Sequence, residues 1–264
     1  MAEVALQTLH VVAKELGLTL GEARESLEAY AERPEDPTLL VTCAERLHDV
    51  HGVLRMVEVY GAALLAEEME QVARFLIEGV DDAPGQKSRN HPEGLDALMR
   101  AMVQLPAYLE RVLGGGRDLA LVLLPLLNDL RAVRGQALLS EGTLLLLNLT
   151  SDRQPQPVPP QPGEPPLNVA QWARRLRPRY QVGLLGWMKG ERAAQHLEIL
   201  SAVAERLEQV ATRQPVFQLW WVVGSLVEAL REGGLEANAT VKRLLGQADR
   251  ELKRLYESGE PRYS

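Results

Sequence analysis

Apolar residues recur at intervals of three and four along most of the chain, which is the pattern of helices with one buried face. Runs that alternate between apolar and polar residues, as half-buried strands do, are scarce. The low aromatic content of 5% and the abundance of Leu, Ala and Glu also favour helices. We therefore expect an all-α protein. The clearest apolar stripe follows Pro37 and consists of Leu40, Leu47, Val50, Leu54 and Val57.

Capping residues, glycines and prolines set the expected ends of the helices. Gly17 is expected to end the first helix, and Thr19 and Glu22 form a capping box that opens the next. Asp118 is expected to cap a later helix that contains Pro125. We expect helices at about 3–16, 19–31, 37–60, 61–79, 91–113 and 118–134, and then at 167–189, 191–212, 215–232 and 238–257.

A proline-rich stretch divides the chain. Residues 151–166 read SDRQPQPVPPQPGEPP and contain seven prolines, with Val158 as the one aliphatic residue. Such a composition favours an extended, semi-rigid spacer, and the alternative interpretation is a PxxP ligand for a partner domain. The sequence therefore predicts two tandem helical bundles, at 1–150 and 167–264, joined by a linker at 151–166.

Charge and composition exclude several classes of function. The net charge of −7 is uneven, because residues 1–150 carry 13 Lys+Arg against 23 Asp+Glu and residues 151–264 carry 16 against 13. This asymmetry suits mutual docking or two distinct partners. No basic pattern with repeated aromatics points to nucleic acid. No apolar stretch approaches the ~20 residues of a membrane span, and the first residues do not form a signal peptide, so we expect a cytoplasmic protein.

The sequence offers little for a cofactor, a metal ion or an enzyme. Cys43 is the single cysteine and is most simply a small core residue. His10, His91 and His196 are isolated in the sequence without the helical His/Glu spacing of a metal site, and no glycine-rich phosphate loop or nucleophile elbow is present. The acidic residues Glu67, Glu68 and Glu70 are expected to form a solvated helix edge. We expect no cofactor, no metal, no ATP-binding kinase domain and no enzymatic activity.

Candidate chemistry centres on His48. This residue follows Leu47, so its side chain projects about 100° away from the buried stripe, within reach of water. Gly52 lies one turn further on the same side, where the missing side chain leaves the imidazole open to another protein. His51 shares this face, and we assign Arg55 to it as well. The ordinary alternative is a surface histidine with no further role.

The spacing of His48 and Gly52 resembles the acceptor motif of histidine-phosphotransfer (Hpt) domains. Three longer segments are similar to the N-terminal region of the chemotaxis-type hybrid kinase of type IV pilus systems (the ChpA/PilL family) and to its stand-alone FimL relatives: MVEVYGAALLAEEMEQV, LPLLNDLRAVRG and RYQVGLLGWMKGE. The resemblance implies Hpt-like bundles whose partners are a response regulator of the PilG type and a FimV-type pilus hub protein. The motif lysine is replaced by His51, and a histidine lacks the permanent positive charge with which a lysine favours a phosphoryl group.

An internal repeat links the two halves. The segment AEEMEQVA that starts at Ala66 returns as AERLEQVA, which starts at Ala204, 138 residues later. At the same offset, the second half predicts a degenerate motif without the acceptor histidine. In that motif His48 falls on Gly186, His51 on Lys189 and Gly52 on Gly190.

Two functions remain open at this point. The first is a non-enzymatic scaffold of a type IV pilus chemosensory pathway, which docks response regulators and a pilus hub protein on Hpt-like bundles. The second is a working phosphotransfer domain in which His48 accepts the phosphoryl group.

Overall fold

A computed structural model describes residues 2–81, 91–149, 154–160 and 162–260. All regular elements within these ranges are helices, so the all-α prediction is confirmed. The chain splits into two compact units, residues 1–144 and residues 145–264.

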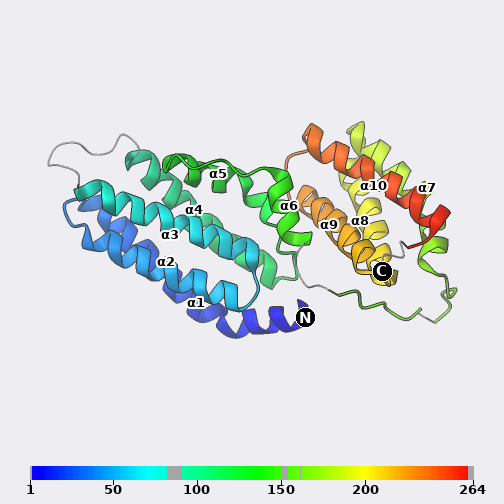
Figure 1. The fold of residues 1–264 in the computed structure, drawn as a ribbon, viewed down its shortest axis with the longest axis horizontal. Coiled ribbons are helices and arrows are strands. Elements are labelled where there is room, and N and C mark those ends of the chain that lie inside the picture. The colour runs from blue at the N-terminus through cyan, green and yellow to red at the C-terminus, as the bar shows by residue number, and fades with distance from the viewer. Residues whose placement is uncertain (1, 82–90, 150–153, 161, 261–264) are drawn as a thin grey trace. The chain divides into compact units, whose positions relative to one another are not determined.

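The first unit is built around a four-helix bundle. Each helix contacts the next and α4 returns to α1, so the four helices surround one core (Figure 1). The helices are α1 (Ala2–Glu32), α2 (Thr38–Met56), α3 (Tyr60–Asp81) and α4 (His91–Leu113). A 3-10 turn, η1 (Ala120–Leu123), and α5 (Leu124–Val133) pack on α3 and α4. The division between the units falls within α6 (Glu141–Leu149).

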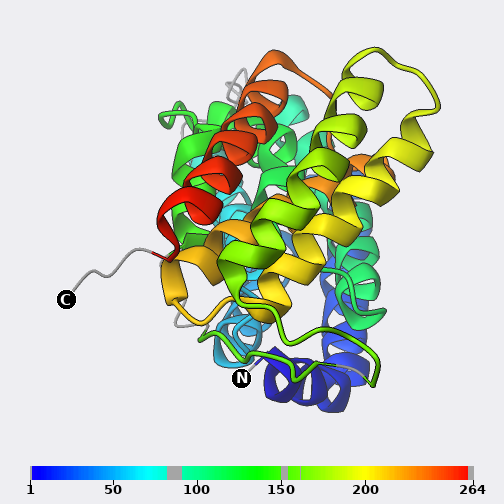
Figure 2. The same cartoon turned by 90° about the vertical axis from the view of Figure 1, so that its right-hand side faces the viewer.

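The second unit repeats this arrangement with four helices of similar length. They are α7 (Val169–Met188), α8 (Ala193–Val210), α9 (Gln214–Arg231) and α10 (Ala239–Ser258). Consecutive helices contact one another and α10 packs on α7, as Figure 2 shows for α7, α8 and α10. Trp220 and Tyr180 are fully buried at the centre, with their rings edge to face at 6.0 Å. The Tyr180 hydroxyl donates to the Leu245 carbonyl at 2.8 Å, so its polar end is satisfied inside the core.

The apolar stripe of α2 lies where the sequence places it. Leu47, Val50 and Leu54 are all completely buried, which confirms the predicted core face. The bounds of α4 agree with the predicted helix at 91–113, including Pro106 inside it. The helices of the second unit also match within a few residues.

The expected break at Gly17 is wrong, because α1 runs without interruption through it. A glycine inside a helix costs about 1 kcal/mol relative to alanine. Burial of Leu16, Leu20 and Leu27 on the same stripe outweighs this cost. The Thr19 hydroxyl donates to the Glu15 carbonyl at 3.0 Å, so it serves the helix interior instead of a capping box.

The expected cap at Asp118 is also wrong. Its carboxylate is buried and accepts hydrogen bonds from the Gly61 N–H at 3.0 Å and from the Tyr108 hydroxyl at 2.5 Å. Asp118 therefore joins the start of α3 to α4. The pKa of Tyr108 is raised well above its ordinary value by burial and by the negative charge of Asp118. Pro125 occupies the first turn of α5, where its missing N–H costs no helical hydrogen bond.

We predict that the two units unfold independently. All four tryptophans, Trp172, Trp187, Trp220 and Trp221, belong to the second unit. Tryptophan fluorescence should therefore follow only the second unit, whereas far-UV circular dichroism follows both. A fragment of residues 1–150 should fold and melt cooperatively by circular dichroism. A molten or insoluble fragment would mean that the units complete each other's core.

Candidate functional site

Two histidines of α2 meet one glutamate of α3 on the surface of the first unit. The Nδ1 atom of His48 lies 3.1 Å from Oε1 and 3.2 Å from Oε2 of Glu70. The Nδ1 atom of His51 lies 3.7 Å from Oε2 of the same carboxylate. We call these three residues the His48–His51–Glu70 cluster.

The cluster has a buried floor and an exposed rim. The side chain of Glu70 is 6% exposed and that of His51 is 14% exposed, whereas that of His48 is 65% exposed. The predicted exposure of His48 beside the buried Leu47 is thus confirmed. A partner molecule can reach the His48 imidazole, while the carboxylate that orients it is shielded from water.

The positions of the three side chains follow from the packing of α2 against α3. His48 and His51 are three residues apart, so they lie on one side of α2 next to its buried stripe. Met69 of α3 is fully buried, and Glu70 follows it at the edge of the same contact. Arg74, one turn beyond Glu70, donates from Nε and Nη2 to Oε1 at 2.8 Å. Arg74 therefore fixes the orientation of the Glu70 carboxylate.

Gly52 and Arg55 continue the same surface toward the end of α2. Gly52 is exposed, and a Cβ atom built there would meet nothing within 4 Å. Arg55 is exposed in the last turn. The missing side chain at Gly52 therefore leaves the surface beside His48 open.

The expected solvated edge at Glu67, Glu68 and Glu70 is wrong for the last two residues. Glu68 is 4% exposed and Glu70 is 5% exposed, because α3 has neighbours on several sides. Glu68 pairs with Arg131 of α5 at 2.5 Å and with Arg134, which follows α5. Buried carboxylates need such partners.

The contact between His48 and Glu70 could not be predicted from α2 alone, because Glu70 lies on α3. The signal that could have found them is the equal spacing of His48 and His51 on one helix and of Glu67 and Glu70 on the next. Side chains three residues apart share a face. Two adjacent antiparallel helices with such pairs bring imidazoles and carboxylates together.

The second motif does not match the first in its surroundings. Gly186 lies inside α7, but Lys189 is the C-cap of that helix and Gly190 follows it with a φ of 74°. His51 and Gly52, in contrast, lie within α2. These three residues therefore form a helix end and not a helix face. The imidazole of His196 covers Gly186 so closely that a Cβ atom there would require the imidazole to move.

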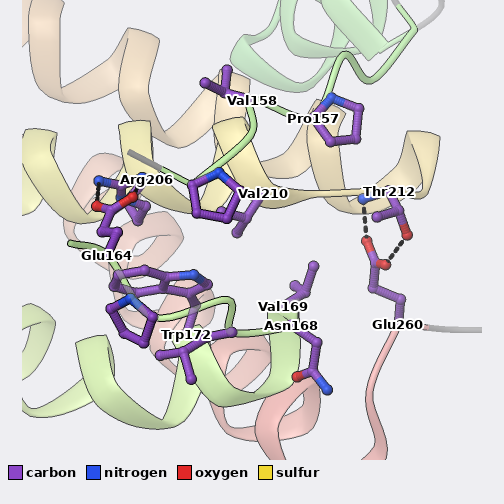
Figure 3. Close-up of a pocket in the computed structure, with 13 residues that line it drawn as sticks. Pro157, Val158, Glu164, Asn168, Val169, Trp172, Arg206, Val210, Thr212 and Glu260 are labelled. Atoms are coloured by element: carbon purple, nitrogen blue, oxygen red, sulfur yellow. Dashed lines mark hydrogen bonds and ion pairs between the residues drawn. The ribbon is translucent and has the colours of Figure 1, made fainter. Parts of the chain in front are cut away.

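The described part of the proline-rich segment lies against the second unit. The Val158 N–H donates to the Gln209 carbonyl of α8 at 2.9 Å, and Glu164 pairs with Arg206 of the same helix (Figure 3). The guanidinium of Arg206 lies 4.9 Å from the centre of the Trp172 ring. The segment and the bundle line an open pocket of about 270 Å³. The described part of the segment, 154–160 and 162–166, forms no helix or strand and is held to α8.

Cys43 does not take part in the candidate site. The side chain is completely buried in the first core, as expected for a small core residue. Burial raises the pKa of its thiol to about 12, so the thiol stays protonated at neutral pH.

Comparisons with known proteins cover both units. The FimL C-terminal domain profile matches residues 4–124, and the profile of the FimL scaffold protein second domain matches residues 165–263. The chain is 30% identical to the scaffold protein FimL of Pseudomonas aeruginosa PAO1 over 250 residues. This match covers 94% of the chain and 43% of that relative, so the chain spans less than half of its length.

Neither the solved structures nor the helices of the described residues point to a further class of protein. No solved structure matches the chain. Among the described residues, no helix is long and apolar enough to cross a membrane. The sequence resemblance and the domain matches agree, and the chain is FimL-like in both of its units.

Proposed function

We propose that the chain is a non-enzymatic docking module of a type IV pilus chemosensory pathway. In this proposal, a response regulator of the PilG type docks on the α2 face around His48 and Gly52, and a FimV-type pilus hub protein is a second partner. The relative FimL is named a scaffold protein, which supports a role in holding partners together. The Hpt-like character of the bundles is part of the proposal.

The observation that carries the proposal is the open surface one turn beyond His48. The imidazole is 65% exposed, and Gly52 leaves free space beside it. A partner helix or loop can therefore approach the backbone of α2 closely. The Glu70 carboxylate beneath is already held by Arg74, so the face is ordered before a partner arrives.

We expect Gly52→Gln to abolish most of the binding to the response regulator. The longer side chain fills the space that the partner needs, while glutamine is a better helix former than glycine by about 0.5–1 kcal/mol, so the fold should not suffer. Gly17→Gln is the matched control, because Gly17 is also exposed inside a helix with nothing within 4 Å. A binding titration with each variant measures the effect. Equal affinity of Gly52→Gln and Gly17→Gln would place the docking surface elsewhere.

Phosphotransfer through His48 is the second candidate function, and one contact favours it. Because Nδ1 of His48 faces Glu70, Nε2 is the nitrogen left for reaction. In the transfer step, Nε2 would attack the phosphorus of an aspartyl phosphate, and the bond from phosphorus to the aspartate oxygen would break. A carboxylate that holds the other ring nitrogen would stabilise the cationic imidazole that results.

One variant separates the two functions. His48→Gln removes the nucleophile but keeps a polar side chain of similar length, so a docking module should still bind the response regulator and support twitching motility. A phosphotransfer domain should lose acid-labile phosphate and motility together. Incubation with a phosphorylated response regulator, followed by an assay for acid-labile phosphate, gives the direct reading.

A further inference from the structure

We propose that the His48–His51–Glu70 cluster is a binding site for a zinc-class divalent cation. One ligand atom from each of the three residues lies within 4.8 Å of the others. Two imidazoles and one carboxylate form a donor set that suits zinc, with a fourth position open for water or for a group of a partner. This inference does not depend on the docking of a response regulator.

The distances from Oε2 of Glu70 to the two imidazoles are close to those between neighbouring ligand atoms of a tetrahedrally coordinated ion. Bonds of about 2.0–2.1 Å in a tetrahedron place neighbouring ligand atoms about 3.3 Å apart. Oε2 lies 3.2 Å from Nδ1 of His48 and 3.7 Å from Nδ1 of His51. The ligand atoms of the two imidazoles lie within 4.8 Å of each other, so the two rings would move closer together to share one ion with Oε2.

The surroundings supply outer partners of the kind that metal ligands have. Arg74 binds Oε1 and so leaves Oε2 for the ion. The Nε2 atom of His51 is buried without a hydrogen-bond partner and lies 4.0 Å from Oε2 of Glu67. If Nδ1 binds the metal, Nε2 carries the proton and can donate it to Glu67 once the gap shortens by about 1 Å. Metal binding would then satisfy a polar atom that the apo arrangement leaves without a partner.

The charges around the cluster are compatible with a dication. Glu70 and Glu67 together carry two negative charges against the single positive charge of Arg74. The Arg74 side chain is 49% exposed, so solvent and salt screen its repulsion of the ion. A bound ion would tie α2 to α3 at the middle of both helices.

The test uses the full chain without an affinity tag, after treatment with a chelator. Titration with zinc chloride by calorimetry, and with cobalt chloride by visible absorption, should show one ion per chain. His48→Gln and His51→Gln should each lower the affinity by at least about tenfold, since loss of even an outer partner typically costs 10–100-fold. His10→Gln, a change at another exposed helix histidine, should leave the affinity unchanged. Zinc should also raise the melting temperature of the wild type, and raise it less in the two cluster variants.

Three results would overturn the site. They are the absence of saturable zinc binding in the wild type, unchanged affinity in both cluster variants, and an equal loss in His10→Gln. Glu70→Gln tests the third ligand, and because it alters a buried residue, its circular dichroism spectrum must match that of the wild type. If Glu70→Gln does not fold, His48→Gln still tests the zinc site. The His48 side chain lies at the exposed rim, so its replacement should leave the fold intact.

Discussion

Replacing Glu68 by glutamine should destabilise the first unit by roughly 3 kcal/mol or more, which is the range for breaking a buried ion pair by removing one partner. The Glu68 side chain is 5% exposed and faces two arginines, Arg131 and Arg134, whose side chains are 22% and 13% exposed. The variant leaves both cations in a half-buried place without a counter-charge. Urea unfolding followed by far-UV circular dichroism measures the loss.

The neighbouring residue provides the control for this prediction. Glu67 lies one position earlier on α3 with a side chain that is 47% exposed. Glu67→Gln should change the free energy of unfolding by no more than about 0.5 kcal/mol, as is usual for surface substitutions. If Glu68→Gln lowered the free energy of unfolding as little as Glu67→Gln does, the Glu68 ion pairs would contribute little to stability.

Leu47→Ala should lower the free energy of unfolding of the first unit by roughly 2–5 kcal/mol. Leu47 is completely buried in the core between the helices, so the shorter side chain leaves a cavity. His48→Gln, one residue later, should cost less than about 1 kcal/mol in metal-free buffer, because its contact with Glu70 lies at an exposed rim. Thermal and urea unfolding of both variants measure the contrast.

The outcome for His48→Gln also bears on the site. A loss above about 2 kcal/mol would be the size expected of a buried hydrogen-bonded residue. That result would make His48 part of the core and would remove the basis for both docking and phosphotransfer at this face.

The sequence predicted the helices well where packing and local signals agree. In α2, the apolar stripe gives the buried face correctly. In α4, the glycines that follow Leu113 end the helix where the sequence indicates. At Gly17 the glycine favours the end of a helix, but burial of the apolar stripe on both sides of it stabilises one continuous helix.

The candidate site could be predicted only in part. The exposure of His48 follows from its angle to Leu47 on a single helix, so one sequence segment suffices. The burial of Glu68 and Glu70 depends on which helices surround α3, and this is a property of the packed bundle. The pairing of Glu68 with Arg131 spans 63 positions, which no local pattern encodes.

The close fit of His196 over Gly186 limits how the second unit can change. A Cβ atom at Gly186 would overlap Nε2 of His196 unless that imidazole moved, and the Nδ1–H of His196 donates a hydrogen bond to the Glu191 carbonyl at 2.6 Å, which holds the ring in place. A larger residue at Gly186 would therefore require the His196 side chain to rotate away and to give up its hydrogen bond to the Glu191 carbonyl. In evolutionary terms, a larger residue at Gly186 carries a cost in the packing of α7 on α8 that a substitution at the open Gly52 of α2 does not.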